Sequence, residues 1–202
     1  MQYGLCYLSV VALRSEATDT SELISQVLYG DHFKVLELRK SWSRIRLGFD
    51  KYEGWIDNKQ FQFIDELEYK ELHKSDPLMT TDLVDFITNQ KQQLHPILLG
   101  SALNGLSYLK HAFEGAKGVG SKDKSKLVET AILYLNTPYL WGGKTPFGID
   151  CSGFVQMVYK MNGFKILRDA SQQASQGDAL SFIEESEPGD LAFFDNNEGE
   201  II

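Results

Sequence analysis

The first third of the chain alternates apolar and polar side chains, a pattern typical of half-buried β-strands. In the segment SRIRLGF, Ile45, Leu47 and Phe49 share one face, and the arginines and glycine share the other. The flanking segments HFKVLEL and YEGWI are rich in aromatic and β-branched residues, which strands favour. The apolar run LCYLSVVAL near the start is too short to span a bilayer and predicts another strand. Residues 1–64 are therefore predicted to form a small antiparallel β unit.

Residues 65–120 have a weaker pattern. The segment DPLMTTDLVDFITNQ predicts a short helix from about Thr81, with its apolar residues on one side. The later pieces HPILLGSALNGL and YLKHAFEGAKGVG have glycines at spacings that suit short strands and tight turns. Two interpretations stay open for this region, a second and degenerate β unit or an irregular linker, and we expect the first.

The period changes to that of a helix in residues 121–202. In SKDKSKLVETAILYLN the apolar residues fall on a single helical stripe, with Lys and Glu opposite. A second apolar stripe begins near Cys151, and Gly163 stands where helices commonly end. The predicted elements are helices over 121–136, 151–162 and 169–176, followed by a strand over 191–194.

The composition narrows the classes of function. The sequence has 20 Lys and Arg against 28 Asp and Glu, a net charge of −8 that opposes phosphate binding, so we expect no nucleic-acid partner. Its two cysteines, Cys6 and Cys151, are too few for a disulfide framework or a cysteine metal cluster, and we expect no metal or other cofactor. With Met1 as the native start we expect a cytoplasmic protein, and a periplasmic or cell-surface protein if an export signal has been removed.

The segment TPYLWGGKTPFGIDCSGFVQMVY carries the candidate chemistry. Cys151 stands at the first turn of a predicted amphipathic helix, after a glycine-rich loop that lets backbone approach a ligand closely. Helix N-termini present unpaired N–H groups and a positive dipole end, which lower the pKa of a thiol and can bind an oxyanion. Cys151 is therefore a candidate nucleophile, with a small core residue as the alternative interpretation.

Three strings, PYLWGG, DCSGFVQMVY and EPGDLAFF, resemble the NlpC family of cell-wall cysteine peptidases, which have a circularly permuted papain-like fold. The tip loop after LRS, the YGDHFKVLE strand and the terminal GWI resemble the bacterial SH3-like domains of cell-wall enzymes. The resemblance implies an α+β protein with an SH3-like β-barrel domain over 1–64. A second, degenerate SH3-like unit or a linker follows over 65–120. The papain-like peptidase domain over 121–202 is expected to lack its last strands.

Within that family the resemblance implies specific roles for residues around the cysteine. Cys151 is implied as the thiolate nucleophile and Tyr139 as a hydroxyl near the oxyanion. Asp150 and Ser152 are implied to hold the free amino terminus of the substrate. The structural alternatives are N-capping of the Cys151 helix by Asp150 and Ser152, and ordinary aromatic packing of Tyr139.

The resemblance also implies how a substrate is held. Trp141 is expected to shape the cleft, while Glu16 and Tyr52 are the best matches for SH3-domain side chains that cap the substrate's amino end. A solvated glutamate and a turn aromatic are the alternatives for these two residues. The implied substrates are peptidoglycan-derived L-Ala-γ-D-Glu-diamino-acid peptides, cut at the γ-D-glutamyl-diamino-acid bond.

The sequence departs from the family pattern at the histidine that serves as the base. The resemblance places this histidine on a strand after PGDLAFF, whereas all four histidines precede Cys151, namely His32, His73, His95 and His111. We expect the 202 residues to belong to a longer peptidase, or to a truncated form that binds muropeptide without cleaving it. A non-catalytic cell-wall binding protein, and an amidase or acyltransferase with the same core, stay open as other functions.

Overall fold

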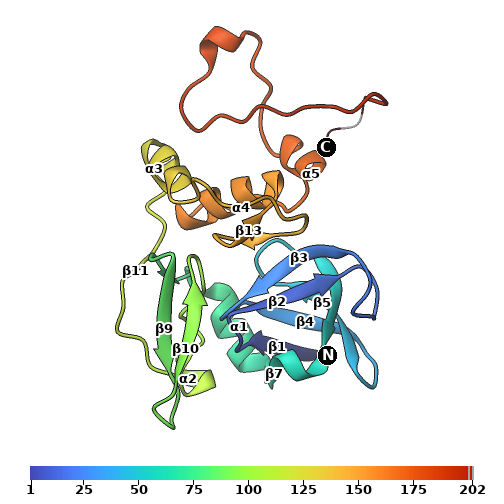
Figure 1. Cartoon of the computed structure of the whole chain (residues 1–202), viewed down its shortest axis with the longest axis vertical. Coiled ribbons are helices and arrows are strands. Elements are labelled where there is room, and N and C mark those ends of the chain that lie inside the picture. The colour runs from blue at the N-terminus through green and yellow to red at the C-terminus, as the bar shows by residue number, and fades with distance from the viewer. Residues whose placement is uncertain (200, 202) are drawn as a thin grey trace.

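The computed structural model describes residues 1–199 and 201 of the chain. Its first part is one seven-stranded antiparallel sheet with the order β3-β2-β6-β5-β4-β1-β7, at the lower right of Figure 1. The strands are β1 (Gln2–Cys6), β2 (Val10–Arg14), β3 (Leu23–Leu28), β4 (His32–Leu38), β5 (Trp42–Leu47), β6 (Glu53–Asp57) and β7 (Phe61–Ile64). A 3-10 turn, η1 (Asn58–Gln60), joins the last two strands. The β unit predicted from the alternating pattern is therefore present.

The alternation along β5 reports directly which side of the sheet is buried. Ile45 and Leu47 are buried in a core shared with β2, β3 and β4, whereas Arg44 and Arg46 are exposed and pair with Glu53 on β6. Exposed ion pairs of this kind contribute little to stability. Burial of the apolar face is therefore the main source of the sheet's stability.

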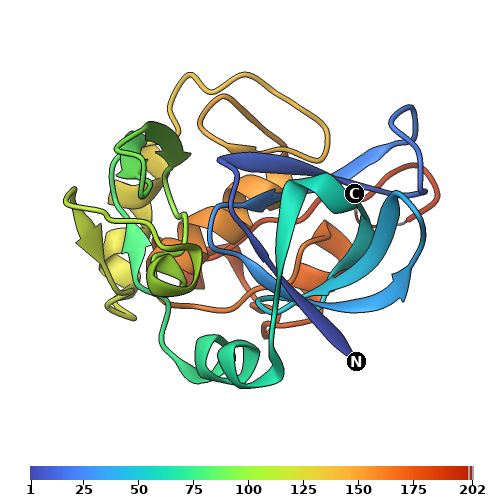
Figure 2. The same ribbon diagram turned by 90° about the horizontal axis from the view of Figure 1, so that it is seen from below.

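The middle of the chain packs beside this sheet, as the green segments of Figure 2 show. Its elements are α1 (Glu66–Lys74), β8 (Met79–Thr80), β9 (Val84–Thr88), β10 (Leu94–Leu98), α2 (Leu106–Leu109) and β11 (Lys117–Gly118). The strands form two separate pairs, β9 with β10 and β8 with β11. Buried residues from this region share a core with Tyr3 and Leu5 of β1. The assignment of residues 65–120 as a second, degenerate SH3-like unit stays a prediction.

The helix predicted from about Thr81 is wrong, because this segment forms strand β9 of a hairpin. The turn is fixed by Asn89, whose side-chain oxygen accepts hydrogen bonds from the N–H groups of Lys91 and Gln93. Gln92 has a positive φ of 59° there. An Asn side chain that bonds the backbone two residues on is a turn signal, and pairing with β10 outweighs the local helical spacing.

The last part of the chain contains mainly helices and lies above the sheet in Figure 1. Its elements are η2 (Lys124–Lys126), α3 (Leu127–Ile132), β12 (Lys144–Thr145), β13 (Gly148–Ile149), α4 (Cys151–Met161), α5 (Ala170–Ala174) and η3 (Ile183–Glu185). Helix α4 begins and ends as predicted, and Gly163 has a φ of +83° just after it. Its residues Met157 and Val158 pack against Leu28 of β3. None of the helices in the described range is long and apolar enough to cross a bilayer.

Two predictions for this part differ from the structure. Helix α3 covers six residues of the predicted 121–136, and Leu135, which the stripe placed inside, is 73% exposed. The segment 191–194 forms no strand, and within residues 1–199 and 201 the bridge nearest to it joins Asp195 to Ile201. A strand needs a partner for its N–H and C=O groups, and Phe194 is 73% exposed here.

Candidate active site

Cys151 is the first residue of α4 and is exposed. The helix begins there because Asp150 has extended backbone angles and its side chain accepts a hydrogen bond of 2.6 Å from the N–H of Gly153. Gly153 lies so close to the carbonyl oxygen of Gly143 that a Cβ atom would collide with it. The glycines beside the cysteine therefore let the loop and the helix approach each other, and they leave the thiol at a helix N-terminus.

A pocket of about 300 Å³ opens in front of this thiol. It is lined by residues from both the sheet and the helical part, namely Glu22, Ile24, Tyr52, Trp141, Asp150, Cys151, Ser152, Arg168, Asp169, Ala170, Ser171 and Ile201. Five of the seven residues singled out from the sequence lie together here, and Tyr139 and Glu16 are the two that do not line it. The structure thus brings distant parts of the chain to one cavity beside a cysteine.

Asp150 is the centre of a hydrogen-bond network at the wall of this pocket. Its carboxylate accepts hydrogen bonds of 3.0 and 2.7 Å from the two terminal nitrogens of Arg168, and further bonds from the N–H groups of Gly142 and Gly153. Arg168 is 1% exposed and also donates to Ser152 at 2.8 Å. Both oxygens of Asp150 are thus occupied by fixed donors. The N-cap interpretation of Asp150 is confirmed, and Arg168 is the partner that the sequence analysis missed.

Two other carboxylates face the pocket with capacity for a ligand. Glu22 accepts a hydrogen bond of 2.7 Å from the indole nitrogen of Trp141 through one oxygen, and its second oxygen makes no hydrogen bond within the described residues. Asp169 accepts a bond of 2.9 Å from the hydroxyl of Tyr52 and is also the N-cap residue of α5, in a capping box with Gln172. Burial, and then this bond, raise the pKa of Tyr52, so the hydroxyl stays protonated and donates the hydrogen bond to Asp169.

Tyr139 lies next to the cysteine without lining the pocket. It is 67% exposed and forms a bridge with Ile149, two residues before Cys151. Partial desolvation, followed by the nearby Cys151 and Asp150, raises its pKa. Its hydroxyl makes no hydrogen bond to the described residues and keeps its proton for donation.

Glu16 lies elsewhere, in the loop between β2 and β3. Its backbone N–H bonds the hydroxyl of Ser21, and that turn brings Glu22 rather than Glu16 against Trp141. The histidines also lie outside the pocket. None of the described residues that line it is a histidine, since His32 and His73 line a different cavity and His95 lies beside His111 with the two rings tilted.

The two cysteines are expected to react very differently with iodoacetamide. Cys151 is exposed at a helix N-terminus, whereas Cys6 is fully buried and its pKa is raised mainly by that burial. Alkylation of the native protein at neutral pH should therefore label Cys151 to completion before Cys6 is modified. Peptide mapping by mass spectrometry measures this, and Cys6 is the internal control. Equal labelling of both thiols in folded protein would contradict the assignment of Cys151 as the reactive one.

Known proteins share this architecture. Residues 136–201 match the model of the NlpC/P60 family, and residues 13–61 match that of the bacterial dipeptidyl-peptidase Sh3 domain. The chain is 28% identical to a dipeptidyl-peptidase 6 of Lysinibacillus sphaericus, over 86% of this chain and 74% of that protein. It is also 28% identical to a gamma-D-glutamyl-L-lysine dipeptidyl-peptidase of Bacillus subtilis, over 87% of this chain and 65% of that protein. The chain thus spans about two thirds to three quarters of the length of these relatives.

Solved structures agree at the level of the fold. An NlpC/P60 family protein from Bacillus cereus superposes with a TM-score of 0.79 and 20% identity, over 99% of this chain and 86% of that one. An NlpC/P60 endopeptidase from Photobacterium damselae gives a TM-score of 0.63 and 16% identity, over 85% of this chain and 45% of that one. The exposed cysteine at the start of α4 lies within the matched NlpC/P60 segment, and the antiparallel sheet contains the matched Sh3 segment. The fold and both matches therefore agree that residues 136–201 form an NlpC/P60 domain and that a bacterial SH3 domain over residues 13–61 precedes it.

Proposed function

We propose that the Cys151 pocket is the site of a cysteine endopeptidase for cell-wall peptides with a free N-terminal L-Ala. The bond cut is the one between γ-D-Glu and a diamino acid. The observation that carries the proposal is the pairing of an exposed helix-terminal thiol with two carboxylates, Glu22 and Asp169, in one pocket. The name of the Bacillus subtilis relative, a gamma-D-glutamyl-L-lysine dipeptidyl-peptidase, supports the substrate class.

The amino terminus of the substrate is assigned to Glu22 and Asp169. An ammonium group needs carboxylate oxygens that are not already committed, and those of Asp150 are held by Arg168 and two backbone N–H groups. Tyr52 holds Asp169 in place with its hydrogen bond. Asp150 then acts by positioning the thiol-bearing helix and Arg168. A pocket of about 300 Å³ suits an acyl group of dipeptide size.

The reaction proposed for this geometry is acyl transfer. The thiolate of Cys151 attacks the γ-carbonyl carbon of D-Glu, and the C–N bond to the diamino acid breaks as that amine takes a proton. Charge develops on the carbonyl oxygen, where backbone N–H groups at the start of α4 and the Tyr139 hydroxyl are the available donors. Water then hydrolyses the thioester and frees L-Ala-D-Glu.

The described pocket does not supply a general base for this reaction. A thiolate peptidase uses an imidazole to accept and return protons, and none of the described residues lining the pocket is a histidine. We therefore propose that residues 1–202 by themselves bind the peptide without turning it over. This observation also favours the second candidate function, a non-catalytic protein that binds muropeptides.

Binding is expected to depend on the charge of the peptide's amino group. Calorimetric titration of Cys151→Ala protein with L-Ala-γ-D-Glu-L-Lys should show affinity that N-acetylation reduces about 10–100-fold, because a charged hydrogen-bonded pair is lost. Asp169→Asn and Glu22→Gln should each weaken binding by about tenfold. Glu16→Gln is the matched control and should leave affinity unchanged. Equal affinity for free and acetylated peptide would refute this assignment.

The two candidate functions differ in their response to added imidazole. If the site is catalytic, free imidazole should bring about slow cleavage of the peptide by the otherwise inactive 202-residue chain, and Cys151→Ala should abolish that cleavage. A pure binding protein shows the same affinity and no cleavage. Cleavage is followed by the release of L-Lys.

A further inference from the structure

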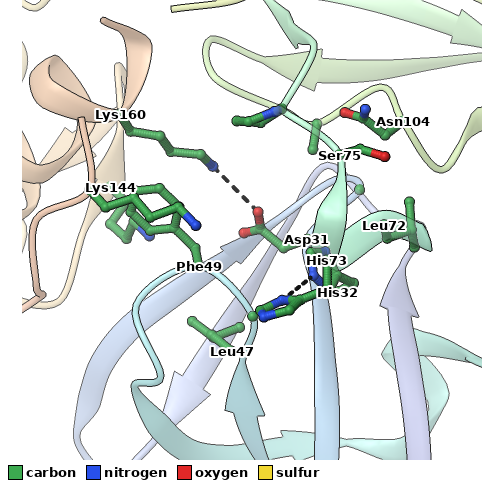
Figure 3. A pocket seen from close by; sticks show the side chains of 15 residues that line it. Asp31, His32, Leu47, Phe49, Leu72, His73, Ser75, Asn104, Lys144 and Lys160 are labelled. Carbon is green, nitrogen blue, oxygen red and sulfur yellow. Dashed lines mark hydrogen bonds and ion pairs between the residues drawn. The ribbon is translucent and has the colours of Figure 1, made fainter. Parts of the chain in front are cut away.

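A second pocket, of about 60 Å³, lies where three parts of the chain meet. Its walls come from the start of β4, the end of β5, the end of α1, the loop near Asn104, and the NlpC/P60 domain (Figure 3). It shares no lining residue with the Cys151 pocket. The volume is enough for a few water molecules or one small polyatomic ion. This second pocket is therefore a site separate from the proposed active site.

The lining is strongly basic. Three lysines, Lys144, Lys160 and Lys165, face one carboxylate, that of Asp31. Lys160 contacts one oxygen of Asp31 at 3.4 Å (Figure 3), and the N–H of Leu28 donates to the other at 2.8 Å. Within the lining the lysines thus outnumber the carboxylates three to one, and Asp50 acts on Lys144 from outside the lining.

Lys144 is the least balanced of these charges. It is 2% exposed, and its ammonium group makes no hydrogen bond or ion pair with any residue the structure describes. Burial lowers its pKa to about 8, with Asp50 as the largest opposing influence. At pH 7 the group is still largely protonated, so an ammonium ion stands at the pocket wall without a hydrogen-bond acceptor among the described residues. Burying an ammonium group costs free energy unless an anion accepts hydrogen bonds from it.

The remaining walls suit a small anion with several oxygens. Lys165 is exposed, which leaves its side chain free to turn toward a ligand. His32 lies 3.4 Å from His73, and burial lowers its pKa to about 4, so at pH 7 it is neutral and can donate an N–H. The apolar wall includes the ring of Phe49, over which Lys160 lies at 5.4 Å. A compact set of donors in a partly apolar pocket is how proteins hold phosphate and carboxylate groups.

We propose that this second pocket binds a small oxyanion, a phosphate or carboxylate group, between Lys144, Lys160 and Lys165. The ligand accepts hydrogen bonds from the ammonium group of Lys144, which has no acceptor among the described residues, and adds negative charge to a lining of three lysines and one carboxylate. Because the lining comes from the SH3 domain, from α1 and from the NlpC/P60 domain, a bound anion also links these three parts of the fold. Binding then stabilises the folded chain by mass action.

Histidine resonances give a local test with internal controls. His32 and His73 line the second pocket, whereas His95 and His111 lie together near the β9–β10 hairpin. Titration with sodium phosphate at pH 7, against sodium chloride at equal ionic strength, should shift the ring signals of the first two along a saturable curve. The signals of the other two should not follow it. Equal movement of all four signals, or none beyond that in chloride, would overturn the proposal.

Variants test which side chains hold the anion. Lys144→Met and Lys165→Gln should each weaken phosphate affinity about tenfold or more, since each removes one charged donor. Lys91→Gln, on an exposed turn, is the matched control and should bind like the wild type. Should Lys144→Met fail to fold, Lys165→Gln still decides, because Lys165 is exposed.

Titration with sodium acetate distinguishes a site for phosphate groups from a site for carboxylate groups. Saturable shifts with phosphate alone assign the pocket to tetrahedral phosphate groups, and shifts with acetate as well assign it to carboxylates too. Unchanged phosphate affinity in both lysine variants would refute the assignment, even if the histidine signals move.

Discussion

Replacing Arg168 by methionine is expected to lower the free energy of unfolding by about 3–5 kcal/mol, the usual cost of removing one partner from a buried ion pair. Arg168 is 1% exposed and donates to both oxygens of Asp150 and to the hydroxyls of Ser25 and Ser152. Methionine fills similar space and leaves the Asp150 carboxylate charged and buried. Urea unfolding followed by circular dichroism measures the loss.

Two controls separate charge from packing in this experiment. The double variant Arg168→Met with Asp150→Asn should recover part of the loss, because no uncompensated carboxylate is left. Lys70→Met, which breaks the exposed pair with Glu66, should leave the unfolding midpoint close to that of the wild type. Equal midpoints for Arg168→Met and Lys70→Met would show that the buried network contributes nothing to stability.

Acidification is expected to destabilise the protein through His32 by at most about 3 kcal/mol between pH 6.5 and pH 4. Burial first, then His73, Lys160 and Lys165, lowers the pKa of His32 from 6.5 to about 4, and Asp31 opposes this. Below pH 6.5 His32 becomes protonated in the unfolded chain, whereas in the folded chain it stays neutral until about pH 4. The contribution to stability is therefore complete above pH 6.5 and is lost as the pH falls through the folded-state pKa.

The variant His32→Gln isolates this effect. Glutamine does not titrate, so the difference in unfolding free energy between wild type and variant should shrink or reverse as the pH falls from 6.5 to 4. Urea unfolding at several pH values gives this difference directly, and carboxylates that titrate in both proteins cancel. A difference that is the same at every pH in this window would contradict a buried, neutral His32.

Local patterns predicted the elements whose cause is local. Strand β5 follows from the alternation of Ile45 and Leu47 with arginines, and α4 follows from its N-cap and Gly163. The segment at β9 was misread as a helix because its partner strand and the Asn89 turn decide its structure. Helix α1 was missed, although Asp65 and Glu68 form a capping box at its start.

The candidate site was predictable where the chain itself brings residues together. Cys151 has Asp150 and Ser152 as neighbours in sequence, and all three line one pocket. Arg168 stands seventeen positions after Cys151 in no recognisable pattern, so its pairing with Asp150 appears only in three dimensions. Glu22 and Asp169 reach the pocket because of the course of the backbone around them, which residue types alone do not specify.

Strand β3 and the residue before it accept three hydrogen bonds from the NlpC/P60 domain. Glu22 accepts from Trp141, Ser25 accepts from Arg168, and the side chain of Gln26 accepts a 2.7 Å bond from the N–H of Lys144. The two domains are therefore not interchangeable modules. A chimera that replaces the SH3 domain with an unrelated barrel keeps a well-formed pocket only when the incoming edge strand carries acceptors at the same three positions.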